Sequence, residues 1–166
     1  EKPVICRLNG SAVGLGATLA LMCDVIFAAD TARIGDPHVR LGLVAGDGGA
    51  VIWAQRIGLG RAKEFLLTGE LVAAKRAEEI GLVNHCLPAA ELDAAVEAFC
   101  QKLLNGASRA INWTKVLMNM ELKRIASAVL EAGVAYESVS VRTAELREGV
   151  KALKEKRRPS FGEPEG

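Results

Sequence analysis

Residues 9–24 read NGSAVGLGATLALMCD, and this stretch decides how the first half of the chain folds. The apolar run at residues 4–8 just before it is typical of a buried strand. Glycines at positions 10, 14 and 16 then allow a tight turn, and the small residues that follow suit a short buried helix. Such a turn leaves peptide N–H groups uncovered at a helix start, where they attract either a phosphate or an oxyanion formed during a reaction.

Up to about residue 87 the chain alternates short β-type runs with helical spacing, and beyond it the pattern is helical only. The predicted strands are 4–8, 25–29, 33–35 and 82–87. The predicted helices are 17–23, 50–57, 61–67, 73–80, 90–104, 109–120, 125–146 and 148–158. This order predicts the α/β class, with a mixed layer over residues 1–87 followed by a helical region over residues 88–166.

Composition narrows the class of protein. The 166 residues suffice for one domain, half of them are hydrophobic, and a net charge of +1 gives no reason to expect nucleic acid or an anionic membrane as a partner. We find neither an apolar run long enough to span a bilayer nor the pattern of a secretory leader, and therefore expect a cytoplasmic protein. The four cysteines follow no metal or redox spacing, so we expect reduced thiols in the core and no metal centre.

The glycine turn has two interpretations. One is a dinucleotide site, because a strand, Gly14 and Gly16, a helix, a second strand and a terminal Asp30 follow in the order of that fingerprint. In that fingerprint the third glycine would fall at Leu19, and the helix before Asp24 has room for only about two turns. The other interpretation is an oxyanion hole.

Several further motifs accompany the turn in a fixed order. They are Lys2-Pro3-Val4-Ile5, Leu19-Ala20-x-Met22-Cys23-Asp24, Arg33-Ile34-Gly35-x-Pro37, Leu41-Gly42-Leu43, Leu67-Thr68-Gly69, Gly81-Leu82-Val83-Asn84 and Arg147-Glu148-Gly149-Val150-Lys151-Ala152. Together with the glycine turn they resemble the enoyl-CoA hydratase/isomerase (crotonase) superfamily over essentially the whole chain. The beginning Glu1-Lys2-Pro3, directly before a strand and without methionine, leads us to expect the C-terminal two-thirds of a member.

The resemblance implies a fold and an assembly. It implies a spiral of ββα turns, of which residues 1–87 would form the later turns with the acyl-CoA site. Residues 88–166 would then be the helical region through which members form trimers or pairs of trimers. In such an assembly the C-terminal residues of one subunit reach the CoA site of its neighbour, and Lys156 is the matching lysine here.

The resemblance also implies chemistry. Members take acyl-CoA thioesters as substrates without a tightly bound cofactor, and two backbone N–H groups hold the thioester oxygen as it becomes an enolate. By position, one donor is the N–H of Leu15, between Gly14 and Gly16. The other donor belongs to an earlier loop, which is not part of this sequence.

The chain departs from the family at the two glutamates with which hydratases add water. Thr18 and His38 stand at the matching positions, so ordinary two-glutamate hydration is not expected. His38 is one candidate base, and Arg40 would share its face in an extended segment and keep it neutral. Asp47 is the other, because some isomerases and dehalogenases of the superfamily carry an acid in this loop. Asp47 also stands where the N-cap of the next helix belongs.

Three functional hypotheses follow. The first is an acyl-CoA enzyme that stabilises an enolate at Leu15 and moves one proton with His38 or Asp47, as an isomerase does. The second is a non-catalytic acyl-CoA-binding or assembly subunit, and the third is a dinucleotide-binding module. Trp53 and Trp113 both stand at helical core positions and are interpreted as packing residues.

Overall fold

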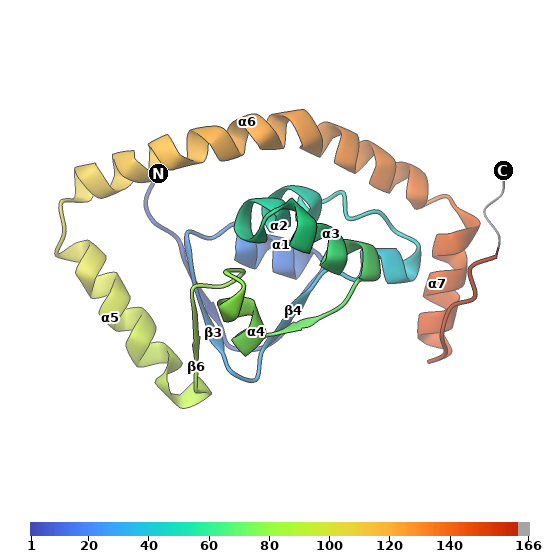
Figure 1. Ribbon diagram of the computed structural model, residues 1–166, viewed down its shortest axis with the longest axis horizontal. Coiled ribbons are helices and arrows are strands. Elements are labelled where there is room, and N and C mark those ends of the chain that lie inside the picture. The colour runs from blue at the N-terminus through green and yellow to red at the C-terminus, as the bar shows by residue number, and fades with distance from the viewer. Residues whose placement is uncertain (163–166) are drawn as a thin grey trace.

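The computed structural model describes residues 1–162 and contains two small sheets wrapped by helices (Figure 1). The first sheet is fully parallel and has the order β1 (Ile5–Leu8), β3 (Val25–Ala29), β6 (His85–Leu87). The second has the order β2 (Ala12–Val13), β4 (Arg33–Gly35), β5 (Val72–Ala73), with β5 antiparallel to β4.

The chain visits the two sheets alternately and so winds into a spiral. One turn consists of β1, β2 and helix α1 (Leu15–Leu21), and the next begins with β3 and β4. The second turn continues through a short 3-10 helix η1 (His38–Leu41) and the helices α2 (Gly49–Ile57) and α3 (Leu59–Thr68). After α3, the chain adds β5, helix α4 (Ala74–Glu79) and β6. β3 pairs with β1 while β4 pairs with β2, so each turn stacks on the one before and confirms the predicted ββα spiral.

The main core lies between the sheets and helices α1, α2 and α4. Trp53 of α2 is fully buried there with Leu21, Ile26, Ile34 and Leu82, which confirms its interpretation as a packing residue. The opposite face of the first sheet buries Phe27 against Leu92 of α5 (Leu92–Leu104). The first sheet is thus covered on both faces, as parallel sheets are.

The C-terminal helices differ from the prediction in two respects: residues 121–124 do not interrupt a helix, and the last helix spans residues 144–154 instead of 148–158. Residues 109–146 were expected to form two helices interrupted near residues 121–124, but α6 runs unbroken over Ser108–Ser140. Residues 121–124 are all good helix formers, and Glu121 pairs with Arg124 one turn later. The break comes at residues 141–143, where the Thr143 hydroxyl accepts a hydrogen bond from Leu146 N–H and caps α7 (Ala144–Lys154).

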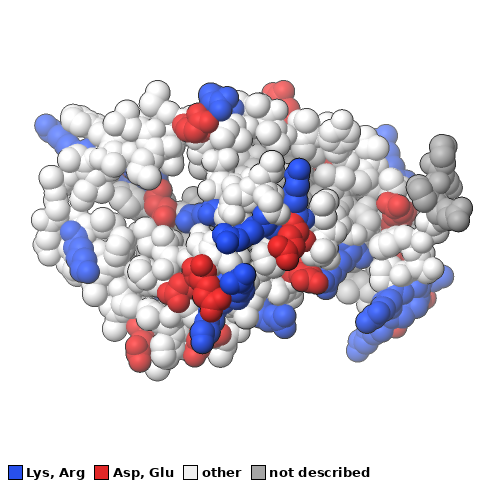
Figure 2. Space-filling view, in the orientation of Figure 1, with Lys and Arg blue, Asp and Glu red and all other residues white. Residues whose placement is uncertain are grey.

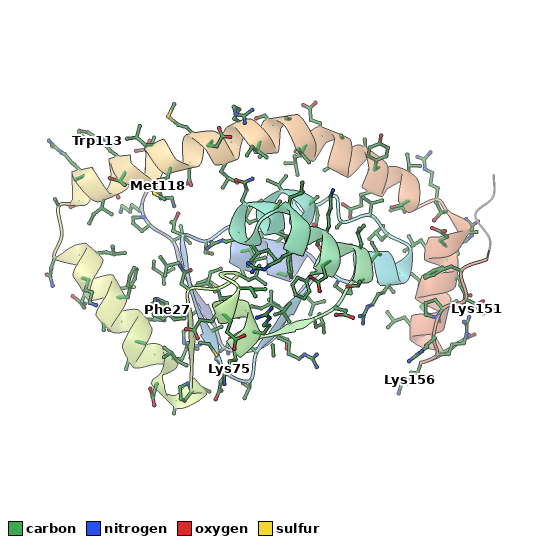
Figure 3. All side chains as sticks on the ribbon, in the orientation of Figure 1. Phe27, Lys75, Trp113, Met118, Lys151 and Lys156 are labelled. Carbon is green, nitrogen blue, oxygen red and sulfur yellow. The ribbon has the colours of Figure 1, made fainter. Side chains whose placement is uncertain are left out.

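α6 arches across one side of the molecule, over α1 and α2, and α7 then turns down past η1 (Figure 1). Near its beginning, α6 is anchored by Lys115, whose ammonium lies 2.6 Å from a carboxylate oxygen of Asp24. Trp113, less than one turn before, is 63% exposed and points away from the core, so its interpretation as a core residue is wrong (Figure 3). Residue spacing on a helix cannot tell a face covered by the same chain from a face left open.

Charges of both signs are interspersed over the middle of the face in Figure 2, and basic side chains predominate over α7. Within residues 1–162, no helix combines the length and apolar character needed to cross a bilayer. The four cysteines are unpaired and half-buried rather than fully buried.

Candidate active site

The glycine turn joins β2 to α1 with a backbone that only glycine adopts readily. Gly14 has φ 57° and ψ −127°, its N–H donates to Gly35 O at 2.9 Å, and its own carbonyl accepts from Thr18 N–H at 3.0 Å. Leu15 is the first residue of α1, and no acceptor within residues 1–162 meets its N–H. The amide predicted to be an oxyanion donor therefore has no hydrogen-bond partner among the described residues.

His38 lies directly against this turn. A Cβ placed on Gly14 would come within 3.4 Å of His38 Cε1 and 3.8 Å of Nε2. The ring belongs to the first residue of η1 and is 13% exposed. One edge of the imidazole thus faces the backbone that carries the free amide.

Two carboxylates flank the imidazole. His38 Nδ1 forms a hydrogen bond with Asp36 Oδ1, while Nε2 lies 3.8 Å from Asp47 Oδ2. The hydrogen bond to Asp36 raises the pKa of His38 above its usual 6.5, and the charges of Asp36, Asp47 and Glu137 raise it further against the opposing effect of burial. The ring is therefore held towards its charged form.

This finding corrects the expectation for Arg40. Its guanidinium turns away from His38 and donates from Nε to the carbonyl of Thr68 at 3.0 Å. The expectation assumed an extended segment, in which residues two apart share a face. Residues 38–41 instead form a 3-10 turn, so Arg40 does not lie beside the imidazole and does not keep it neutral.

Asp47 contacts both Thr18 and the start of α2. Its Oδ1 lies 3.3 Å from the Thr18 hydroxyl and 3.4 Å from Gly49 N–H, the latter a weak contact at the start of α2. The N-cap residue of that helix is Gly48 rather than Asp47. Since Thr18 is 1% exposed, its hydroxyl serves the carboxylate and stays away from solvent.

The loop that carries Asp47 is held by the long helix α6. Gly46 packs backbone to backbone against Gly133, where a Cβ on Gly133 would come within 2.8 Å of Gly46 O. Two residues earlier in the loop, Val44 N–H donates to the Ser140 hydroxyl at 3.2 Å. The helical region, expected mainly to join subunits, thus also positions the candidate site within one chain.

The fold brings together four of the predicted site residues: Gly14, Leu15, His38 and Asp47. Gly16 follows in the first turn of α1, with open space around its Cα. Lys156 does not join them, because it lies beyond the end of α7, far from α1 and α2 (Figure 3).

Sequence reasoning missed Asp36, the fully buried partner of His38. Its position two residues before the histidine, across Pro37, was the available signal. The pattern Asp-Pro-His alone did not reveal that the carboxylate folds back onto the ring.

Asp36, His38 and Asp47 each offer a potential metal-ligand atom, all within 4.8 Å of one another. The Nδ1 of His38 is already committed to a hydrogen bond with Asp36, however, while Nε2 lies 3.8 Å from the Asp47 carboxylate. A cavity of about 580 Å³ between α6 and the end of α1 is lined by none of them.

Comparison with known proteins gives a consistent result. The family model for enoyl-CoA hydratase/isomerase matches residues 1–164. A putative enoyl-CoA hydratase/isomerase, YngF, of Bacillus subtilis is 37% identical over 96% of this chain and 62% of its own length. The 2,3-dehydroadipyl-CoA hydratase of Escherichia coli is 33% identical over 97% of this chain and 63% of its own.

Solved structures agree with the sequences. An enoyl-CoA hydratase from Mycobacterium avium subsp. paratuberculosis superposes with a TM-score of 0.92 at 30% identity, over 97% of this chain and 65% of that one. A carnitinyl-CoA hydratase from Mycobacterium avium gives 0.90 at 28% identity, over 96% and 62%. The chain spans about three-fifths of the length of the curated relatives it matches. Given the spiral, the glycine turn and a family match over nearly all of its residues, this chain belongs to the enoyl-CoA hydratase/isomerase family.

Proposed function

We propose that the protein processes acyl-CoA thioesters by stabilising an enolate at the Leu15 amide and moving a proton with His38 and Asp47. The observation that carries the proposal is that a free N–H at a helix start and an acid–base pair meet at one glycine turn. Named relatives act on CoA thioesters, among them the 2,3-dehydroadipyl-CoA hydratase, which supports this substrate class. The similarity to enzymes that act on CoA thioesters also favours the oxyanion interpretation of the glycine turn over the dinucleotide interpretation. A backbone donor of this kind contributes roughly 3–4 kcal/mol to the stability of a developing oxyanion.

Proton transfer between carbons fits these residues better than hydration does. The position of the first hydratase glutamate holds Thr18, a buried hydroxyl that cannot act as a base near neutral pH without activation. In the isomerase reaction Asp47 removes a proton from C2 of a 3-enoyl-CoA. The dienolate oxygen rests on the Leu15 N–H, and charged His38 returns a proton at C4 to give the 2-enoyl-CoA. No atom is gained or lost overall, and one acid and one base suffice.

A direct assay tests this proposal. The intact protein is incubated separately with a 3-enoyl-CoA and with crotonyl-CoA, and the absorbance of the conjugated thioester is followed. We expect conjugation to appear from the 3-enoyl-CoA and crotonyl-CoA to be hydrated slowly or not at all. Brisk hydration would contradict our interpretation of Thr18 and His38. Binding of CoA esters without turnover of either substrate would support the alternative, a non-catalytic acyl-CoA-binding or assembly subunit.

We also propose that the C-terminal helices join copies of the chain, as a trimer or a pair of trimers. The support is a row of exposed apolar side chains along one face of α6: Trp113, Leu117 and Met120 are each more than 60% exposed. Exposed apolar patches of this kind mark interaction surfaces. In such an assembly Lys156 would bind a CoA phosphate in the site of a neighbouring subunit.

The assembly proposal predicts the effect of a charge on this face. The double variant Trp113→Glu, Leu117→Glu should lower the mass measured by light scattering after size exclusion, because two carboxylates cannot be buried unpaired in an interface. Lys123→Glu, at an exposed position of the same helix, is the matched control and should leave the mass unchanged. An unaltered mass in the double variant would show that this face of α6 joins no subunits.

A further inference from the structure

The buried carboxylate of Asp36 has so far been described only as a group that raises the pKa of His38. Asp36 follows β4, is 1% exposed and has a side chain that is inaccessible to solvent. Its Oδ1 accepts from His38 Nδ1 and lies 3.4 Å from the backbone N–H of the same residue. Its Oδ2 is buried without a hydrogen-bond partner among the described residues. A buried carboxylate left half satisfied is costly for stability, which indicates that something other than folding requires it.

The position of this carboxylate is fixed by packing. Gly49, at the start of α2, lies so close to Asp36 Oδ2 that a Cβ there would overlap the oxygen. The backbone of α2 therefore covers one side of the carboxylate and the imidazole covers the other. With so little room to rotate, Asp36 holds its Oδ1 towards Nδ1.

We propose that Asp36 is a positioning residue for His38, committing Nδ1 so that Nε2 is the ring nitrogen that exchanges a proton with the substrate. A carboxylate offers only acceptors, so Nδ1 must be the donor in this pair. The opposite nitrogen, Nε2, is the one that lies towards Gly14 and Asp47, at 3.8 Å from the Asp47 carboxylate. The arrangement is that of a proton-transferring imidazole oriented by a buried carboxylate on its far side.

The inference rests on the proposed function for its catalytic meaning, but its physical content can be measured without any substrate. Among residues 1–162, three acidic groups face the imidazole: Asp36, Asp47 and, from α6, Glu137. Of these, only Asp36 makes a hydrogen bond to it. Removing the charge of Asp36 should therefore lower the pKa of His38, whereas an acid that serves folding alone would leave the titration of the ring unchanged.

The chain has only two histidines, which makes the measurement simple. NMR of the isotope-labelled protein, with any affinity tag removed, gives two imidazole signals that can be followed against pH. His85 is the internal reference, because it is exposed on β6 and stacks on Phe27 at a centroid distance of 4.5 Å. The variant His85→Gln assigns the two signals.

In the unaltered protein, two-bond proton–nitrogen spectra above the pKa of His38 should show its neutral ring protonated at Nδ1. In Asp36→Asn the midpoint of the His38 titration should shift to lower pH, while the substitution leaves the signals of the distant His85 unchanged. A neutral ring protonated at Nε2 in the unaltered protein would overturn the proposal even if the variant failed to fold. A His38 titration midpoint that did not shift in a folded Asp36→Asn variant would also overturn the proposal.

Kinetics separate this inference from the proposed function. If the isomerase is active, Asp36→Asn should lower kcat on the order of 10²-fold with little change in KM, and should move the alkaline limb of the pH profile to lower pH. Full activity in Asp36→Asn, alongside an inactive His38→Gln, would reject the role of Asp36 and leave the function standing. An inactive unaltered protein whose His38 titrates as expected would reject the function and leave the positioning role intact.

Discussion

Asp47→Asn and His38→Gln are each expected to slow the isomerisation of a 3-enoyl-CoA by about 10²–10⁴-fold in turnover rate, the usual contribution of one general acid or base. Both substitutions keep the size of the side chain, so the packing around the turn should survive. In Asp47→Asn the amide cannot accept the proton removed from C2 of the substrate. In His38→Gln the amide cannot donate a proton to C4. The measurement is steady-state kinetics, with KM expected to change little because neither group is proposed to hold CoA.

The matched control for the histidine is His85→Gln. This residue is the other histidine of the chain, lies on β6 outside the site and is exposed, so its replacement should leave the turnover rate unchanged. Activity within a few-fold of normal in either Asp47→Asn or His38→Gln would remove that residue from the mechanism.

The proposed role of His38 as proton donor predicts how the rate of isomerisation depends on pH. The pKa of His38 is raised above 6.5 by its hydrogen bond to Asp36, and the charged ring is the proposed proton donor. The rate should therefore fall as the pH rises through the pKa of His38, and it should do so at a higher pH than an imidazole with the ordinary pKa would give. A rate that increased over that range would indicate that neutral His38 acts as the base instead.

Gly133→Ala should have the second large effect, on the stability of the protein. In the interior of a helix this change normally stabilises by up to about 1 kcal/mol. Here a Cβ would come within 2.8 Å of Gly46 O and 3.3 Å of Gly46 Cα, both backbone atoms that cannot move aside without shifting the loop. We expect a loss of about 1–3 kcal/mol in the free energy of unfolding, the usual cost of overpacking. Activity should fall as well, because Asp47 follows Gly46 directly.

Gly60→Ala is the matched control, since Gly60 lies in α3 with open space around its Cα. Denaturant unfolding should show that variant unchanged or slightly more stable. Equal stability changes in the two variants would mean that Gly133 of α6 does not pack closely against Gly46 of the loop.

Much of the fold could be predicted from local pattern. The strands at residues 25–29 and 33–35 were predicted with the bounds that the structure has, because β-branched and apolar runs between polar turns are governed by neighbouring residues. Boundaries of the long helices were less predictable. Residues 121–124 continue α6 because they are good helix formers, and the next helix begins at the Thr143 cap; the spacing of apolar residues, from which the helices were predicted, encodes neither.

Of the candidate site, too, one part could be predicted from the local sequence and another part could not. The glycine turn at residues 14–16 could be recognised because a positive φ at Gly14 is a local requirement that few residues satisfy. The electrostatic setting of His38 could not. Arg40 was expected beside it and lies elsewhere, while Asp36 was overlooked and proved to be its partner. The difference is one of backbone conformation, since a 3-10 turn instead of an extended segment redirects every side chain in it.

By itself, the sequence determined the family, the spiral of strands and helices, and the turn that leaves the Leu15 amide uncovered. Each of these depends on residues close together in the chain, whose conformational preferences act over a few bonds. Only the tertiary structure decided that Asp36 and Asp47 flank His38 and that α6 holds the Asp47 loop through Gly133. These contacts join residues that are far apart in sequence or lie across a turn, and their geometry is set by close packing of the whole fold, which no local pattern records.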